Sequence, residues 1–291
     1  MGVRYLAGTQ GCNAMPLTPF TPSLSYSLTG PDRAPVVALL SGLGGVQAGW
    51  AQQVRGLSSR WRVLTHDARG IGGSGSTDQD LTMRDYAEDL LRLLDFLGVE
   101  SAHLVGLSFG GRVAQEFALA WPDRVDRIVL GGTSCRTRPV GEASPDALVA
   151  LQNLAELDAE GWETRLLPAL FGRAYREKHP RRIQALARWR GRHRPQAEGI
   201  AGQWQAYYRF DLSEQVHAIQ SPTLILHGTD DGLSPGVNAE ELHRLIPGSR
   251  LIWMNEVGHA PNVERPEAFN AVLDAFLSDG ALDQVLASHS V

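Results

Sequence analysis

The sequence feature that most limits the fold is the run Gly-Leu-Ser-Phe-Gly at residues 106–110, which separates a strand-like run from a helix-like run. Residues 102–105 before it are apolar and β-prone, and residues 112–120 after it have helical character. A chain that turns from strand into helix within one residue forces the serine into a strained backbone conformation, and flanking glycines keep side chains out of the turn. The sequence therefore predicts an exposed Ser108 hydroxyl at a helix start, where backbone N–H groups and the helix dipole favour a developing negative charge.

A serine hydroxyl is a weak nucleophile at neutral pH and needs a histidine base, which in turn needs a carboxylate to orient it. His259 fits the base, because it lies in a loop directly after the strand-like run 251–254, and catalytic groups of open α/β sheets collect past strand ends. Asp230 and Asp231 both fit the acid, since they lie in a turn after the buried-strand pattern 223–228. We favour Asp231, and Asp230 remains the alternative.

Attack on a carbonyl group creates an alkoxide that two preorganised N–H donors must stabilise, and losing one such donor typically lowers the rate by about 10²–10³. Phe109 directly follows the serine and supplies one backbone N–H. We expect the second donor from the glycine-rich loop after residues 36–40, with Leu43 as the favoured residue. A plain strand-to-helix connection is the simpler interpretation of that loop, but together with the serine turn the functional interpretation is favoured. Gly42 of the same loop is a candidate for contact with the substrate.

These segments resemble the α/β-hydrolase superfamily, in which the catalytic residues follow one another as serine, acid and histidine. The similarity extends from about residue 22 to about residue 278. Its motifs occur in order at residues 41–45, 67–74, 106–110, 228–231 and 258–259. Within the superfamily the chain is similar to capped ester, lactone and enol-lactone hydrolases, especially 3-oxoadipate enol-lactonase-like proteins. The first motif also resembles that of aminoacrylate hydrolases of pyrimidine breakdown, although many members have histidine in place of Ser41.

The resemblance and the alternation of strand-like and helix-like runs both predict an α/β fold, with a mostly parallel central sheet flanked by helices. The strand-like runs are residues 23–29, 36–40, 62–66, 102–107, 125–131, 223–228 and 250–254. The helix-like runs are residues 46–57, 82–97, 110–120, 237–246 and 264–277. Residues 135–210 contain four further helix-like runs without a convincing strand, the first of which begins at Ser144-Pro145.

These runs predict a domain organisation with an inserted helical cap. We expect an N-terminal extension (1–20), an α/β-hydrolase core (21–134 and 211–280), a cap (135–210) and a C-terminal tail (281–291).

The composition excludes several classes of protein. At 291 residues with 43% hydrophobic content, the chain can bury one large core. Its formal net charge of −5 provides no general attraction to nucleic acid or to an anionic membrane. No apolar run approaches the roughly 18 residues of a membrane span, and the N-terminus lacks a signal-peptide pattern. Because Cys12 and Cys135 are the only cysteines and lie far apart, we expect reduced thiols in a cytoplasmic protein.

The cap is expected to select the substrate, because aromatic side chains in a lid over a cleft suit an apolar pocket. Trp189, Trp204 and Tyr208 are the candidates for contact with the substrate, although packing within the cap must use most of its aromatic residues. Residues 176–194 contain eight arginine or lysine side chains, for which a solvated helix face is the simpler explanation. The alternative is that one or two of them bind a substrate carboxylate. The candidates for that role are Arg181, Arg188 and Arg192.

Two other patterns have simple structural interpretations. Residues 70–75 match Gly-x-Gly-x-x-Gly after a strand, but a dinucleotide motif should open a helix directly, so we expect a tight turn here. His66, His103 and His227 lie in or beside buried strands, and we expect core histidines with satisfied hydrogen bonds. His227 is the one with an alternative functional role, because it is next to the acid turn. No pair of His or Cys has the spacing of a zinc site, so neither a metal nor a cofactor is predicted.

The sequence thus predicts a serine hydrolase that cleaves a carboxylic ester or lactone of a small molecule through an acyl-enzyme. Ser108 would attack the carbonyl carbon, His259 would move the proton, and Asp231 would orient His259. Hydrolysis of a carbon–carbon bond and cofactor-free perhydrolase chemistry are alternatives on the same scaffold. A non-catalytic ligand-binding homologue is an alternative of a different class, but a binding protein has no need for serine, aspartate and histidine together.

Overall fold

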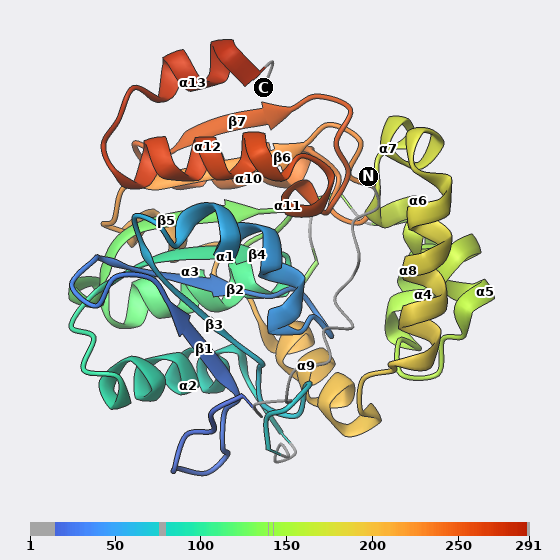
Figure 1. Cartoon of the computed structure of the whole chain (residues 1–291), viewed down its shortest axis with the longest axis horizontal. Helices are drawn as coiled ribbons and strands as arrows, with labels where there is room; N and C mark the ends of the chain where they lie inside the picture. Colours follow the sequence, from blue (N-terminus) through green and yellow to red (C-terminus); the bar gives the residue numbers. More distant parts are fainter. Residues whose placement is uncertain (1–14, 76–79, 139, 142, 290–291) are drawn as a thin grey trace.

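A computed structural model of the chain describes residues 15–75, 80–138, 140–141 and 143–289. Its centre is a seven-stranded sheet with the strand order β1-β3-β2-β4-β5-β6-β7 (Figure 1). The strands are β1 (Tyr26–Thr29), β2 (Val36–Leu40), β3 (Arg62–His66), β4 (Ala102–Leu107), β5 (Val125–Gly131), β6 (Thr223–Gly228) and β7 (Arg250–Met254). β1 pairs antiparallel with β3, and the other neighbours pair in parallel. The predicted mostly parallel α/β sheet is therefore confirmed.

Helices cover both faces of this sheet. One face has α1 (Ala51–Leu57), α12 (Pro266–Leu277) and α13 (Leu282–His289), and the other has α2 (Met83–Phe96), α3 (Phe109–Ala120) and α10 (Val237–Leu245). Neighbouring residues of a strand point to opposite faces. Leu39 of β2 accordingly packs in the apolar cluster with α1 and α12, whereas Ala38 packs in the cluster with α2 and α3. The short helices η1 (Gln47–Trp50), η2 (Pro122–Arg124) and η4 (Val216–Ala218) lie in connecting loops.

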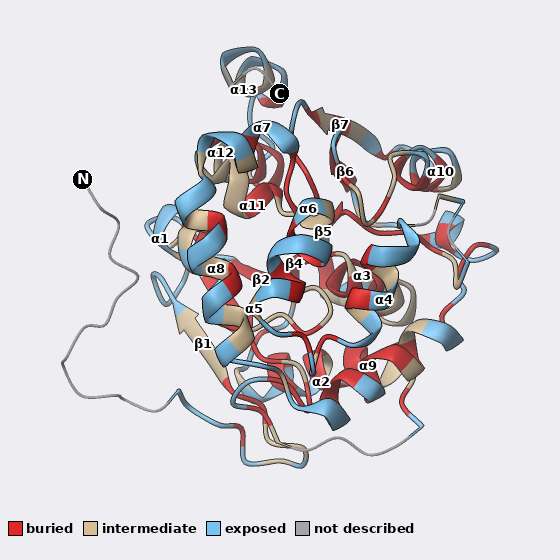
Figure 2. Ribbon diagram, turned by 90° about the vertical axis from the view of Figure 1, so that its right-hand side faces the viewer, coloured by how far each residue is buried: buried red, intermediate tan, exposed pale blue. Residues whose placement is uncertain are grey.

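Between β5 and β6, the described residues form helices. These are α4 (Pro145–Gln152), α5 (Ala159–Gly161), η3 (Trp162–Leu166), α6 (Leu167–Leu170), α7 (Arg173–Lys178), α8 (Pro180–Arg192) and α9 (Ala197–Arg209). They include the four predicted helical runs, of which the first begins at Ser144 and the others centre near residues 166, 186 and 204, and α7 was not predicted. The arrows of β5 and β7 point toward the side where α6, α7 and α8 lie (Figure 1), and α4, α5, α6 and α8 lie in front of the sheet when that side faces the viewer (Figure 2). We call residues 135–210 the cap segment.

Three boundaries differ from the prediction. The first strand begins at Tyr26 instead of residue 23, because the residues before it pair with the N-terminal chain, where Leu17 and Ser25 form an antiparallel bridge. The predicted helix at 264–277 is divided into α11 (Pro261–Glu264) and α12, since Pro266 cannot donate the hydrogen bond that would continue α11. The predicted C-terminal tail contains α13, in which Leu282 is buried against the core.

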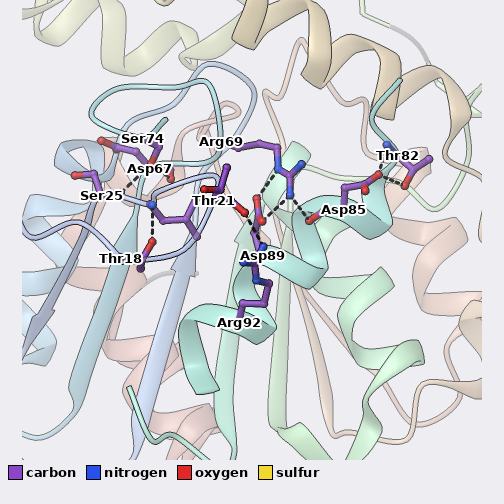
Figure 3. A network of polar contacts seen from close by, with 11 residues as sticks. Thr18, Thr21, Ser25, Asp67, Arg69, Ser74, Thr82, Asp85, Asp89 and Arg92 are labelled. Atoms are coloured by element: carbon purple, nitrogen blue, oxygen red, sulfur yellow. Dashed lines mark hydrogen bonds and ion pairs between the residues drawn. The ribbon is translucent and has the colours of Figure 1, made fainter. Parts of the chain in front are cut away.

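The predicted tight turn at residues 70–75 is present, and it folds around the carboxylate of Asp67 (Figure 3). Oδ1 of Asp67 accepts a hydrogen bond from the backbone N–H of Gln47 (2.7 Å), and Oδ2 accepts one from Gly73 (2.9 Å). Gly72 has φ 57°, and a Cβ at that position would lie 2.3 Å from Oδ2 of Asp67. The glycines are therefore explained by the turn. Residues 76–79, which follow it, lie outside the described residues.

A buried ion pair lies beside this turn. Nε of Arg69 is 2.6 Å from Oδ2 of Asp89 on α2, and NH2 is 2.6 Å from Oδ1, so the pair is bidentate (Figure 3). Both side chains are less than one-tenth exposed. At the start of the same helix, Thr82 and Asp85 form a capping box. These contacts fix the position of α2 against the loop that follows β3.

Candidate active site

The turn between β4 and α3 has the strained backbone that its sequence predicts. Ser108 has φ 54° and ψ −117°, and a positive φ of this kind costs on the order of 1–3 kcal/mol in a residue other than glycine. A Cβ on Gly106 would lie 2.4 Å from the carbonyl oxygen of Gly110, and a Cβ on Gly110 would lie 2.2 Å from that of Leu40. Both positions therefore require glycine, and Ser108 lies at the N-terminus of α3.

Two hydrogen bonds hold the backbone of Ser108 against the end of β5. Its N–H donates to the carbonyl oxygen of Gly131 (2.8 Å), and its own carbonyl oxygen accepts from the hydroxyl of Thr133 (2.8 Å). Gly131 is the last residue of β5. The strained turn is thus fixed to the neighbouring strand, which also sets the position of the serine hydroxyl.

The loops after β6 and β7 bring the predicted acid and base together. Nδ1 of His259 lies 2.8 Å from Oδ2 of Asp231, and both residues are buried. Oδ1 of Asp231 accepts hydrogen bonds from the N–H groups of Leu233 (2.9 Å) and Ser234 (2.8 Å). Asp230 is exposed, and its N–H donates to a backbone oxygen in the histidine loop. Of the two adjacent carboxylates, Asp231 is therefore the one in contact with His259. Because a carboxylate oxygen only accepts, Nδ1 of His259 carries the proton, and Nε2 of the neutral ring is left as an acceptor.

Gly132 connects the serine turn to this pair. It directly follows the strand end to which Ser108 is bonded, and it has φ 54°. A Cβ on Gly132 would lie 2.9 Å from Nδ1 of His259 and 3.3 Å from Oδ2 of Asp231. The absence of a side chain here lets the imidazole and the carboxylate approach the end of β5. Ser108, Asp231 and His259 thus follow three different strands, and residues 131–133 at the end of β5 contact all three.

The glycine-rich loop after β2 lies directly against the serine. A Cβ on Gly42 would be 3.3 Å from Cβ of Ser108 and 3.8 Å from its Oγ. Within the described residues, no recorded hydrogen bond uses the N–H of Leu43 or of Phe109. Both N–H groups therefore remain candidates for the oxyanion donors.

Gln203 of α9 ties this loop to the cap segment. Its Oε1 accepts a hydrogen bond from the N–H of Gly44 (2.7 Å), and its side chain is 1% exposed. Sequence reasoning missed this residue, because a single glutamine within a helix has no distinguishing pattern. The contact connects the position of the cap to the position of the predicted oxyanion loop.

The three aromatic candidates of the cap have different surroundings. Trp204 is 8% exposed, and its Nε1 donates to the carbonyl oxygen of Leu151 (3.3 Å). Tyr208 stacks on Trp204 with ring centroids 5.3 Å apart but is 52% exposed. Trp189 is 39% exposed and stacks on His193. The hydrogen bond of Trp204 and the ring stacking of all three lie within the cap, so their contact with substrate stays a prediction.

The basic stretch of the cap is mostly a solvated surface. Arg181, Arg188 and Arg192, the three candidates for the alternative of an inward cation, are all exposed, as the preferred interpretation of a solvated helix face predicts. The guanidinium of Arg190 is more buried, and it lies over the rings of Trp162 (5.1 Å) and Trp189 (5.5 Å). Sequence spacing alone could not show which side of α8 packs inward.

The three buried histidines do not all have the satisfied hydrogen bonds that we expected. In the described structure, the buried Nδ1 atoms of His66, His103 and His227 have no hydrogen-bond partner. Burial lowers the pKa of all three, and that of His66 falls to about 4. In His227, Nε2 lies 2.7 Å from the carbonyl oxygen of Ser234 and therefore carries the proton, so its unpartnered Nδ1 is one unfilled acceptor.

A mostly parallel sheet with a strained serine turn after one strand and a histidine loop after the last defines the α/β-hydrolase class. The sequence profile described as the alpha/beta hydrolase fold matches residues 35–266. The chain belongs to the α/β-hydrolase fold family, and the protein is a hydrolase.

Individual relatives and solved structures agree with this assignment. The chain is 33% identical over 251 residues to RutD of Caulobacter sp. (strain K31), provisionally named as a carbamate hydrolase, with 86% of this chain and 92% of RutD covered. It is 29% identical to 3-oxoadipate enol-lactonase 1 of Acinetobacter baylyi, with 88% and 93% covered. The crystal structure of the enol-lactonase from Burkholderia xenovorans LB400 superposes with a TM-score of 0.80 at 30% identity, and covers 90% of this chain and 100% of its own.

Two further findings concern the described residues alone. No helix in them combines the length and the apolar character that a membrane span needs. The same residues contain no cluster of three or more His, Cys, Asp or Glu that could hold a metal ion. Cys135 is a buried free thiol, and Cys12 lies outside the described residues.

Proposed function

We propose that the protein is a serine hydrolase that cleaves a carboxylic ester or lactone of a small molecule through an acyl-enzyme. The observation that carries the proposal is the 2.8 Å contact between Nδ1 of His259 and Oδ2 of Asp231, beside Gly132, which directly follows the residue bonded to the backbone of Ser108. A buried carboxylate that orients a histidine beside a strained serine is what acyl transfer needs. The enol-lactonase names of two similar proteins support an ester or lactone bond.

The proposed reaction has two steps that share one base. Oγ of Ser108 attacks the carbonyl carbon while Nε2 of His259 accepts its proton, and Asp231 stabilises the charged imidazolium. The N–H groups of Leu43 and Phe109 stabilise the oxyanion. The leaving group departs with the proton from His259, and the acyl group remains on the serine oxygen. Water then loses a proton to His259, attacks the acyl carbon, and releases the acid and the serine hydroxyl.

The similarity to RutD favours a second candidate, the cleavage of a carbamate. The same nucleophile and base would act, but the group on the serine would be a carbamoyl group instead of an acyl group. We also propose that the protein works in the cytoplasm, where the thiol of Cys135 remains reduced.

The nucleophile is tested with a fluorophosphonate probe and an activated ester. We expect the wild-type protein to be labelled at Ser108 and Ser108→Ala to be unlabelled, with kcat reduced by roughly 10⁴-fold or more. Ser58→Ala, at the end of α1, is the matched control and should behave as the wild type. Full activity in a folded Ser108→Ala protein would contradict the acyl-enzyme, and an unlabelled wild type would favour a ligand-binding homologue. A panel of esters, lactones, enol-lactones and carbamates would then separate the two candidate substrates.

A further inference from the structure

A short part of the cap segment, residues 169–172, contacts both loops of the candidate site through its backbone. The N–H of His259 donates to the carbonyl oxygen of Leu170 (2.8 Å). In the loop that follows β6, the N–H of Gly232 donates to the carbonyl oxygen of Ala169 (3.2 Å). The loop of the base and the loop of the acid are therefore both bonded to the C-terminal end of α6.

Glu264, the last residue of α11, adds a connection through its side chain. Oε1 accepts a hydrogen bond from the N–H of Gly258 (2.9 Å), which directly precedes His259. Oε2 accepts one from the N–H of Gly172 (3.0 Å) in the cap segment. One carboxylate thus bonds to the base loop with one oxygen and to the cap with the other.

The two backbones joined by this carboxylate touch each other. A Cβ on Gly258 would lie 2.5 Å from the backbone nitrogen of Gly172, and a Cβ on Gly172 would lie 2.6 Å from the carbonyl oxygen of Glu256. No side chain fits between them. A displacement of the cap at this point would therefore be transmitted directly to the backbone of His259.

The carboxylate occupies a costly position. The pKa of Glu264 is raised to about 7, because burial and the negative charge of Asp231 together outweigh the lowering by the N–H groups of Gly172, Gly258 and Ala260. An apolar side chain of similar size would avoid the cost of desolvating a charge. An apolar side chain would also leave the N–H groups of Gly172 and Gly258 without an acceptor. A carboxylate provides one accepting oxygen for each of them.

We propose that Glu264 is a positioning residue of the hydrolase, which fixes His259 relative to the cap. The proposal rests on the role of His259 as the base in the proposed function. Because a displaced base weakens proton transfer more than it weakens substrate binding, loss of this carboxylate should lower kcat and change KM little. The intact carboxylate would also couple the position of His259 to the cap segment.

The test compares Glu264→Gln and Glu264→Asp with the control Glu267→Gln, an exposed glutamate on α12. Glutamine keeps the length but has one accepting oxygen, so one N–H loses its partner. Aspartate keeps the charge but is one methylene shorter. With p-nitrophenyl acetate as the substrate, we expect kcat to fall by roughly 10–100-fold in both variants, with KM within about threefold of the wild type. The control should keep wild-type values, and thermal unfolding of all three variants should remain cooperative.

Several outcomes would overturn the proposal. These are wild-type kcat in both Glu264 variants, a change confined to KM, or failure of both variants to fold, which would assign the carboxylate to folding. Ser108→Ala and His259→Ala, measured in the same assay, separate this proposal from the proposed function. If both abolish activity while the Glu264 variants match the control, only the positioning role fails. If both retain activity, the proposed function fails.

Discussion

Nε2 of His227 lies 3.5 Å from Oδ2 of Asp231, the same oxygen that lies 2.8 Å from Nδ1 of His259. Nε2 of His227 also donates to the carbonyl oxygen of Ser234 (2.7 Å) and therefore carries a proton. Burial lowers the pKa of His227, which keeps its ring neutral. Asp231 thus lies between two imidazoles, one held neutral by burial and the other the base of the proposed reaction.

This arrangement predicts a supporting role for His227. Ser234 makes two backbone contacts in this network. Its carbonyl oxygen accepts the hydrogen bond from His227, and its N–H donates to Oδ1 of Asp231. His227→Leu leaves that buried carbonyl unpaired, which should lower the free energy of unfolding by about 1–3 kcal/mol. We expect kcat to fall only several-fold, because Asp231 keeps its bonds from Leu233 and Ser234. Urea unfolding and ester kinetics check both values. A loss of activity as large as that of His259→Ala would assign His227 to the chemistry.

The paired carboxylates are expected to differ strongly in function. Asp231→Asn should lose most activity, by roughly 10⁴-fold in kcat, because the amide favours the wrong tautomer of His259 and leaves its charge uncompensated. Asp230→Asn should retain a substantial part, since this side chain is exposed and the backbone provides the contact with the histidine loop. Steady-state kinetics of both variants at one pH give the comparison. The reverse order of activities would transfer the acid role to Asp230.

The sequence predicted what depends on local pattern. The Ser108 turn could be recognised because its glycines and flanking elements are adjacent in the chain, and the positions of the strands along the sequence followed from their apolar runs. Contacts between distant segments had no such signal. Gln203 and Glu264 each satisfy a backbone N–H of another segment, and Arg190 packs inward because of the way α8 is rotated. Side-chain direction on a helix and the partners of loop amides are set by tertiary packing, so these features required the structure.

The buried pair of Arg69 and Asp89 should contribute to stability only as a pair. Arg69→Met leaves the carboxylate of Asp89 buried without its bidentate partner, which should lower the free energy of unfolding by about 3–5 kcal/mol. The double variant Arg69→Met/Asp89→Leu should recover much of that loss. Arg84→Met is the control. Arg84 pairs with Glu88 at the surface of α2, the helix that also carries Asp89, and this substitution should lower the free energy of unfolding by at most about 1 kcal/mol. Urea unfolding of the three variants measures these differences, and a single variant as stable as the control would contradict the prediction.

His66 should make the protein less stable in mild acid. Burial lowers the pKa of His66 from 6.5 to about 4, so between these values the unfolded chain binds a proton that the folded chain does not. The free energy of unfolding should therefore fall as pH drops from about 6.5 to about 4, by on the order of 3 kcal/mol from this residue. Glu264 acts in the opposite sense, since its raised pKa makes stability fall as pH rises from 4.5 to about 7. Urea unfolding of wild type and His66→Gln at pH 7.5 and pH 5 isolates the histidine contribution, and equal pH dependence in both would contradict it.

The basic stretch of the cap should influence anionic substrates only through a field that salt screens. Arg181, Arg188 and Arg192 are exposed, and Arg190 packs on Trp162 and Trp189. Exposed cations raise the local concentration of anions, an effect with a Debye length of about 8 Å at physiological salt and about 3 Å at 1 M.

We therefore expect kcat/KM for a carboxylate-bearing ester to exceed that of its neutral isostere by no more than about tenfold at low salt. The preference should disappear at 1 M salt. Arg190→Met should leave it unchanged, because that guanidinium is held against the two indole rings. Arg188→Met, at an exposed position of the same helix, is the matched control for the loss of one charge. A preference that persists at 1 M salt and is lost in Arg190→Met alone would instead identify Arg190 as a direct partner of a substrate carboxylate.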